Sequence, residues 1–211
     1  WVPTLADPYA LAYWTSPVAY VYSPAFLQGI SPLKALPWPV FLAAWTTILL
    51  LAARWLVGPR LWPLAILVAA PEIAGGNVHL LLAVAIVAGF RWPAAWAFVL
   101  LTKVTPGVGL LWFAVRGEWG RLGVALGATA AVVVGSFAID PSAWARWMDV
   151  LVSSAGKTPG TWAAIGIPLV LRFPVAVALV TWGARTDRRW TVPAAAMVAL
   201  PCCATCPNVL I

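Results

Sequence analysis

Charged residues are scarce in this sequence: they make up 9% of its 211 residues, and only 6 are Asp or Glu. A soluble domain carries about 25% charged and 45–50% apolar residues, whereas 63% of this chain is hydrophobic. The scarcity of charge excludes a soluble enzyme fold, a nucleic-acid reader and a disordered tail. The composition predicts an integral membrane protein in contact with membrane lipids.

Runs of basic residues are also absent, although 13 Lys and Arg residues give a formal net charge of +7. These cations are scattered among apolar stretches, so no segment is built to bind successive phosphodiesters, and we expect no nucleic-acid partner. In membrane proteins such residues set the orientation, because cytoplasmic loops carry an excess of Lys and Arg.

Metal-binding side chains are few. His79 is the only histidine, and the 3 cysteines lie close to the end of the chain. Cys203 and Cys206 have a C-x-x-C spacing, but neither a histidine nor a second cysteine pair accompanies them, as a zinc site would require. We therefore expect no metal site and no cofactor.

The sequence begins at Trp1, without Met or a signal-like segment, and stops at Ile211 within an apolar run. These features indicate a fragment that lacks both the N-terminus and the C-terminus of its protein. We expect such a fragment to be inactive on its own.

Proline and charged residues divide the apolar sequence into segments with the lengths of membrane-spanning or half-spanning helices. Because a backbone in lipid must satisfy its own hydrogen bonds, these segments should be helical. The expected fold is all-α: a polytopic membrane helix bundle in a single domain over 1–211. Its apolar runs are 38–57, 60–74, 77–90, 92–115, 117–138, 162–184 and 190–211.

The basic residues favour one arrangement of segment 92–115. If every run crossed the membrane once, Lys and Arg would be divided evenly between the two sides. If 92–115 instead enters and returns as two half-helices broken at Lys103-Val-Thr-Pro106, most cations lie inside, as the positive-inside rule requires. The inner residues would be Arg54, Arg60, Arg91, Arg116, Arg121, Arg185, Arg188 and Arg189, and the outer ones Lys34, Arg146 and Lys157.

This re-entrant arrangement divides the chain into four parts in a multi-pass plasma-membrane protein. We expect an outer-face loop with interfacial helices over 1–37 and membrane helices over 38–138. A second outer-face loop with an interfacial helix follows over 139–161, and further membrane helices over 162–211. The active site would then face the outside.

The loop 139–161 has the pattern of a helix lying in the membrane interface. Asp140 is a suitable N-cap, and Pro141 suits the first helical position. An apolar face should follow at helical spacing. Its predicted members are Trp144, Trp147, Met148 and Leu151.

Lys103 is the strongest candidate for a binding residue. A charge within a membrane span costs at least about 2.5–3.5 kcal/mol and is normally retained for a substrate or a partner. Pro106 lacks an N–H and clashes with the carbonyl of Thr102, which opens the backbone beside the ammonium group. The alternative is a lysine that extends to the lipid headgroups.

Three further polar residues stand in apolar surroundings. Asn77 and His79 lie at the outer start of a helix, where they offer hydrogen-bond donors to a substrate or simply form a polar cap. Arg172 lies within an apolar run, and a guanidinium there needs a phosphate, a carboxylate or carbonyl oxygens. An ion pair between Arg172 and Glu72 is the structural alternative.

Asp7, within Ala6-Asp7-Pro8-Tyr9, is a candidate general base at the membrane surface. The alternative is a turn-forming aspartate before proline.

Three sequence motifs occur in a characteristic order. They are Tyr22-Ser-Pro-Ala-Phe26 followed by Pro32-Leu33 and Leu36-Pro37, then Gly76-Asn-Val-His-Leu-Leu-Leu82, then Lys103-Val-Thr-Pro106. In order and spacing they resemble glycosyltransferase family 87. The family consists of GT-C-type mannosyltransferases that use a polyprenol-phosphate-mannose donor to build the cell envelope.

The resemblance implies a transferase whose lipid-phosphate-sugar donor enters from the bilayer. Basic groups near the outer face, here Lys103 and Arg172, would bind the donor phosphate. Tyr22, Asn77 and His79 would bind substrate, and an outer-loop Asp would deprotonate a glycolipid or glycan acceptor. In this family that Asp precedes the Tyr-x-Pro motif by more residues than this sequence contains, so we expect it upstream of Trp1, with Asp7 as the candidate within the chain.

A non-enzymatic transporter or flippase is the alternative, because a broken helix also serves as a substrate site in transporters. Such proteins have two similar halves, and this sequence shows no internal repeat. The transferase is therefore the favoured hypothesis.

Overall fold

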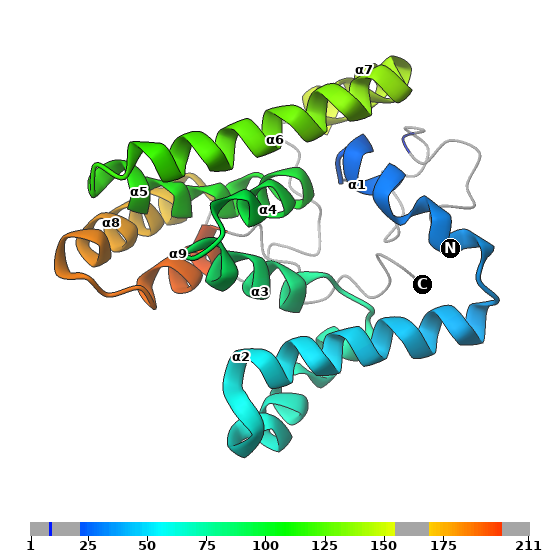
Figure 1. The fold of residues 1–211 in the computed structure, drawn as a ribbon, viewed down its shortest axis with the longest axis horizontal. Coiled ribbons are helices and arrows are strands. Elements are labelled where there is room, and N and C mark those ends of the chain that lie inside the picture. The colour runs from blue at the N-terminus through cyan, green and yellow to red at the C-terminus, as the bar shows by residue number, and fades with distance from the viewer. Residues whose placement is uncertain (1–8, 10–21, 155–168, 200–211) are drawn as a thin grey trace. The chain divides into compact units, whose positions relative to one another are not determined.

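A computed structural model describes residue 9 and residues 22–154 and 169–199 of the chain (Figure 1). In these residues every regular element is a helix, so the predicted all-α class is confirmed. The elements are α1 (Pro24–Ile30), η3 (Ser31–Ala35), α2 (Trp38–Ala74), α3 (His79–Gly89), η4 (Pro93–Ala95), α4 (Trp96–Thr102), η5 (Thr105–Leu110), α5 (Leu111–Val115), α6 (Trp119–Ile139), α7 (Pro141–Ser154), α8 (Leu169–Thr186) and α9 (Thr191–Ala199).

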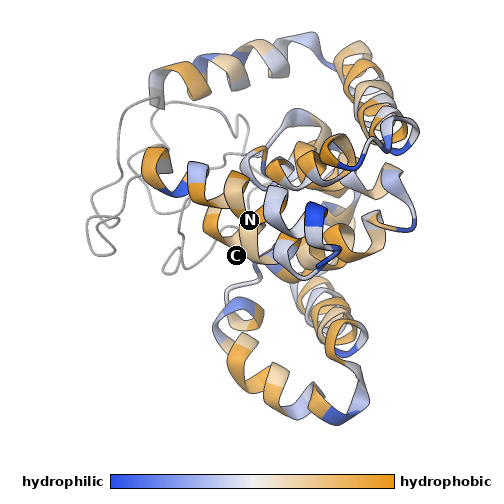
Figure 2. Ribbon diagram, turned by 90° about the vertical axis from the view of Figure 1, so that its left-hand side faces the viewer, coloured by the Kyte–Doolittle hydropathy of each residue, from blue (hydrophilic) through white to orange (hydrophobic). Residues whose placement is uncertain are grey.

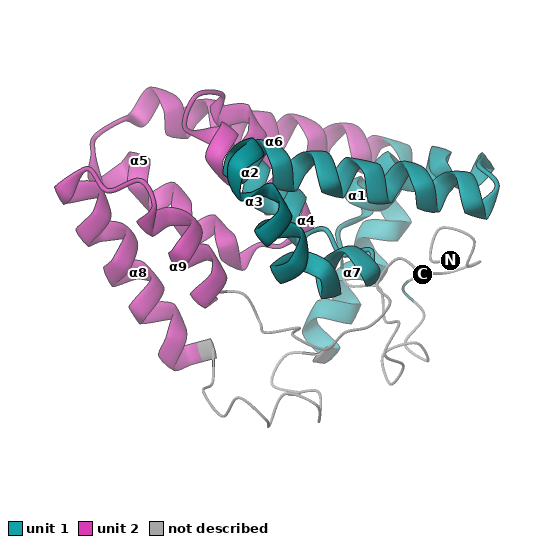
Figure 3. Cartoon of the chain, turned by 90° about the horizontal axis from the view of Figure 1, so that it is seen from below, with its two compact units in different colours: residues 1–84, 139–154, 206–211 teal, residues 85–138, 155–205 magenta. Residues whose placement is uncertain are grey.

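Contacts within the chain group the residues into two compact units (Figure 3). Unit 1 comprises residues 1–84, 139–154 and 206–211, and unit 2 comprises residues 85–138 and 155–205.

Two of the described helices, α2 and α6, are long and apolar enough to cross a membrane. Figure 2 shows hydrophobic residues along most of the helical ribbon. In α6 only 11% of the apolar stretch is buried within the protein. Valine and isoleucine side chains left outside a protein core are unfavourable in water and favourable in lipid. The two helices therefore support membrane association.

Helix α2 consists of two arms joined at Gly58. Gly58 has φ 76° and ψ 172°, a conformation outside the helical region that only glycine adopts readily. Beyond it, the indole nitrogen of Trp62 donates a hydrogen bond to the carbonyl of Leu50 at 3.1 Å, which holds the second arm against the first. This division matches the boundary between the apolar runs 38–57 and 60–74.

In unit 1, α7 begins at the N-cap that the sequence predicts. The carboxylate of Asp140 accepts hydrogen bonds from the Ser142 hydroxyl at 2.6 Å and the Ala143 amide at 3.0 Å. Within the protein, Ala143 and Val150 of α7 are buried, whereas Met148, a member of the predicted interfacial face, is 50% exposed. Helix α7 contacts α1.

The Asp140 cap gives a pH-dependent contribution to stability. The Ser142 hydroxyl and then the Ala143 amide lower the pKa of Asp140 below its ordinary value of 3.8. The contribution is therefore present above that value and is lost as the pH falls through the folded-state pKa. We expect Asp140→Ala to lower the free energy of unfolding by about 0.5–2 kcal/mol at neutral pH.

Thermal unfolding in detergent at neutral pH and near pH 3 measures this effect. The difference between parent and variant should narrow in acid. An equal difference at both pH values would contradict a role for the carboxylate.

In unit 2, helices α8 and α9 pack closely through small residues. Gly183 of α8 lies against Thr191 of α9, so that a Cβ at position 183 would overlap the Thr191 side chain. Helix α9 also contacts η5, and α8 contacts α5. The core of this unit contains large, fully buried side chains, among them Trp96, Val99, Phe113, Val180 and Val192.

Candidate functional site

The chain between α4 and η5 is broken at the position of the predicted lysine. Helix α4 ends at Thr102, and Lys103 is extended, with φ −143° and ψ 119°. Helical turns resume at Thr105, with Pro106 in the first turn of η5. Pro106 has no amide hydrogen to donate back to Thr102, so a continuous helix loses a hydrogen bond there.

The two arms of this broken segment pack side by side in unit 2. Gly107 of η5 lies against Leu100 of α4. The ring of Trp96 meets Phe113 edge to face, with centroids 6.4 Å apart. Because early residues of α4 contact late residues of η5 and α5, the chain reverses direction at Lys103–Val104. We call this segment, Pro93–Val115, the helical hairpin.

Polar groups gather at the tip of the helical hairpin. Lys103 is half-buried, and its amide donates to the carbonyl of Val99 at 2.8 Å. Within the described part of the chain, the buried hydroxyl of Thr105 has no hydrogen-bond partner. A buried hydroxyl without a partner costs about 1–3 kcal/mol, so a ligand that accepts a hydrogen bond from it would be favoured.

Arg172, on α8, donates a hydrogen bond to the carbonyl of Val198 at 3.2 Å. Val198 lies in the last turn of α9, where carbonyl oxygens have no amide within the helix, and a cation there also interacts favourably with the helix dipole. The structure thus gives the guanidinium a carbonyl partner. Both helices contact η5, which begins at Thr105.

In unit 1, a glycine turn joins α2 to α3. Gly76 has φ 61°, and its amide donates a hydrogen bond to the backbone carbonyl of Ile73 at 3.2 Å. The amide of Asn77 donates to the backbone carbonyl of Glu72 at 3.0 Å. This is the Schellman pattern, which ends a helix with a left-handed glycine. The indole of Trp45 donates to the Gly76 carbonyl at 2.9 Å and fixes the turn.

The glycine turn brings Glu72 and His79 together. Nδ1 of His79 lies 2.7 Å from Oε2 of Glu72, and the two side chains are 15% and 32% exposed. A carboxylate on Nδ1 fixes the orientation of the imidazole ring. Asn77 lies between them in sequence and is buried, at 8% exposure. Glu72 is the alternative partner that the sequence suggests for Arg172. In the structure its carboxylate pairs with His79.

Tyr22 is part of the core of unit 1. Its side chain is 2% exposed, and its ring lies 5.0 Å from that of Phe26. The hydroxyl of Tyr9 donates to its carbonyl at 2.9 Å. Tyr22 therefore packs inside the described part of unit 1, and its role in substrate binding remains a prediction. Asp7, the candidate base, lies outside the described residues.

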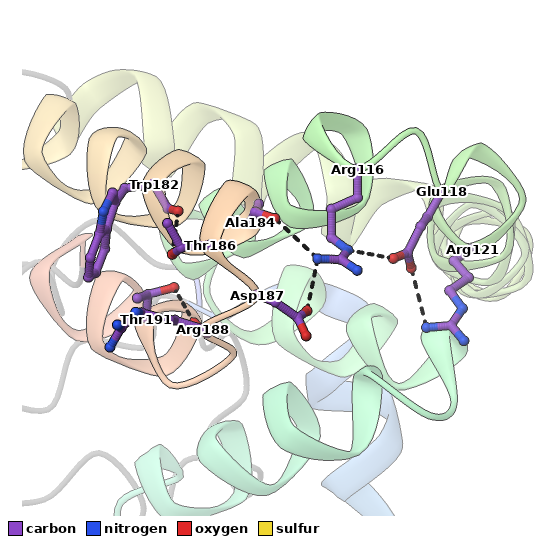
Figure 4. A network of polar contacts seen from close by, with 9 residues as sticks. All are labelled: Arg116, Glu118, Arg121, Trp182, Ala184, Thr186, Asp187, Arg188 and Thr191. Atoms are coloured by element: carbon purple, nitrogen blue, oxygen red, sulfur yellow. Dashed lines mark hydrogen bonds and ion pairs between the residues drawn. The ribbon is translucent and has the colours of Figure 1, made fainter.

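A polar network in unit 2 was not expected from the sequence (Figure 4). Arg116 contacts Asp187 at 2.8 Å, Glu118 at 2.9 Å and the carbonyl of Ala184 at 3.2 Å. The network joins the end of α5 to the end of α8, residues that no local pattern connects. Arg121 extends it through Glu118 at 3.3 Å. We assign it a structural role, because its members are partly exposed and mutually neutralised.

No group of three His, Cys, Asp or Glu side chains is close enough to hold a metal ion among the residues that the structure describes. Comparisons with protein-family models, curated proteins and solved structures found no match for this chain. The functional argument therefore depends on the residues themselves.

Proposed function

We propose that this chain is part of a membrane glycosyltransferase that transfers a sugar from a polyprenyl-phosphate donor to a glycolipid or glycan acceptor. The sequence motifs favour mannose as that sugar. The observation that carries the proposal is Lys103 at the tip of the apolar helical hairpin. Two residues further along the chain is Thr105, whose buried hydroxyl has no hydrogen-bond partner in the described residues. A cation and a hydroxyl donor in apolar surroundings suit a phosphate group.

The proposed reaction exchanges one C–O bond for another. The acceptor oxygen bonds to the anomeric carbon, the bond from that carbon to the phosphate oxygen breaks, and the electron pair leaves on the phosphate. Lys103 stabilises the charge that develops on this leaving group, because few water molecules screen it there. Arg172 would assist if donor binding draws its guanidinium from Val198.

Two further roles belong to residues of unit 1. Asn77 and His79 would bind hydroxyl groups of a substrate, with the His79 ring oriented by Glu72. The acceptor proton would pass to an outer-loop carboxylate, for which Asp7 is the candidate within this sequence. Such an enzyme works in the plasma membrane with its active site facing outward.

A transfer assay with the full-length protein in proteoliposomes tests the proposal. We expect label from a radioactive polyprenyl-phosphate-mannose donor to appear in an acceptor glycolipid. The transporter alternative also uses a broken helix at membrane depth. Movement of the intact donor between leaflets without sugar transfer would favour that alternative and contradict the transferase.

Membrane orientation gives an independent prediction. Under the re-entrant arrangement, the chain around the Gly58 kink and the chain after α5 face the cytoplasm, and α7 faces outward. Gly58 and Gly117 have positive φ angles, so cysteine probes belong at exposed neighbours instead. Leu61, Trp119 and Val152 are 57%, 65% and 70% exposed.

We expect a membrane-impermeant thiol reagent to label Leu61→Cys and Trp119→Cys from the same side and Val152→Cys from the other. The native cysteines are first replaced by serine in this experiment. Labelling of positions 61 and 119 from opposite sides would show that the helical hairpin crosses the membrane fully.

A further inference from the structure

Unit 1 contains an apolar cleft of about 530 Å³ at the kink of α2. Ile48, Leu51 and Trp55 of the first α2 arm form one wall, and Leu81 and Val84 of α3 form the other. Ile48, Leu51 and Trp55 are 45%, 58% and 53% exposed, so the cleft is open to the surroundings of the protein. In a membrane helix those surroundings are hydrocarbon chains.

A cationic side chain lies at the edge of this apolar cleft. Arg54 belongs to the lining, and its Cζ atom lies 5.6 Å from the ring centroid of Trp62. Trp62 is itself held by its hydrogen bond to Leu50, so the guanidinium rests on a fixed aromatic surface. A cation held over an aromatic face keeps its N–H groups available for an anion.

The α2 segment around the kink carries basic residues and no acidic ones. The sequence contains no Asp or Glu between Trp38 and Pro71, and Arg60 adds a second exposed guanidinium just beyond Gly58. In the described part of the chain, the ion pairs involve neither Arg54 nor Arg60. The apolar cleft therefore has hydrocarbon-compatible walls and uncompensated positive charge at one edge.

We propose that the apolar cleft binds one anionic phospholipid. The acyl chain lies against Leu51, Trp55 and Leu81, and the phosphate contacts Arg54, with Arg60 adding long-range attraction. Basic pockets between membrane helices bind lipid head groups in this way. The half-exposed indole of Trp55 suits the boundary between chain and headgroup. The cleft shares no residue with the proposed donor site, and lipid binding there does not depend on sugar transfer.

Lipid retention measured by native mass spectrometry tests the site. The full-length protein is purified from bilayers of equal phosphatidylglycerol and phosphatidylcholine. We expect one phosphatidylglycerol molecule to remain bound after mild delipidation. Arg54→Gln should reduce its retention about fivefold, the factor expected for one basic side chain near a membrane surface.

Matched variants separate a defined site from general lipid contact. Leu51→Trp places a larger side chain in the cleft and should also displace the lipid. Val68→Trp changes a side chain that is 75% exposed and lies outside the cleft lining, and it should have no effect. Arg91→Gln removes an exposed guanidinium that lies over Trp92 instead, 4.9 Å from its ring centroid, and should also have no effect.

Three results would overturn the proposal. Equal retention of phosphatidylcholine and phosphatidylglycerol would show that charge plays no part. Equal losses of bound phosphatidylglycerol in Arg54→Gln and Arg91→Gln would show that any surface arginine has the same effect on lipid retention. Displacement of the lipid by polyprenyl phosphate at equimolar concentration would identify the cleft as a binding site for the donor chain. Sugar transfer measured on the same variants keeps the two proposals distinguishable.

Discussion

Lys103→Met in the full-length protein should lower sugar transfer from the polyprenyl-phosphate donor roughly ten- to a hundredfold. A charge-assisted contact to the leaving phosphate is worth about 1.5–3 kcal/mol, and the full amount appears in the rate if the contact strengthens as the bond breaks. The chain at Lys103 is extended between two helical arms, so the side chain is held at the tip of the helical hairpin. The kinetics with a polyprenol-phosphate-mannose donor measure the effect.

Lys34→Met is the matched control, because it removes the same charge from the last turn of η3, outside the helical hairpin. In solvated surroundings such a charge contributes only about 0–1 kcal/mol to an electrostatic interaction. Met at position 103 should enter lipid more readily than Lys, so loss of activity would not reflect loss of insertion. Equal, small effects of the two substitutions would mean that Lys103 extends to the headgroups, and the phosphate-site assignment would be wrong.

Gly109→Ala should destabilise the protein by about 1–3 kcal/mol, because an added methyl group overpacks a filled core. A Cβ at this position would overlap the Trp96 ring and lie 2.8 Å from Cγ1 of Val192. Both neighbours are fully buried, at 0% exposure, and have no free space into which to move. For a chain of this size, each kcal/mol lowers the Tm by about 2–4 °C. Thermal unfolding in detergent measures the shift.

Gly127→Ala provides the opposite case with the same chemical change. Gly127 lies in α6, and a Cβ there meets nothing within 4 Å. Alanine restricts the unfolded chain more than glycine does, so this substitution should raise stability by about 0.4–1 kcal/mol. If both variants shifted the Tm in the same direction, the contact between η5, α4 and α9 would not be as close as the structure has it.

The helices follow from local rules, and so the sequence predicts them well. In the residues that the structure describes, apolar runs bounded by proline and charged residues are helical, because a proline removes a backbone hydrogen bond whatever the tertiary surroundings. The break at Lys103 and the Asp140 cap are of this kind, since each depends on residues within four positions. The multi-pass topology and the transferase activity remain predictions.

Contacts between distant residues were decided by the tertiary structure alone. The sequence left Arg172 a choice among a phosphate, a carboxylate and carbonyl oxygens, and packing of α8 against α9 supplied the carbonyl of Val198, 26 residues away. Arg116 and Asp187 are 71 residues apart and meet because α5 packs against α8. Gly109 and Gly127 are the same residue type in the sequence, but only at Gly109 does close packing leave no room for an added methyl group. Composition and local pattern determine where helices form, whereas the partners of each polar group depend on which helices pack together.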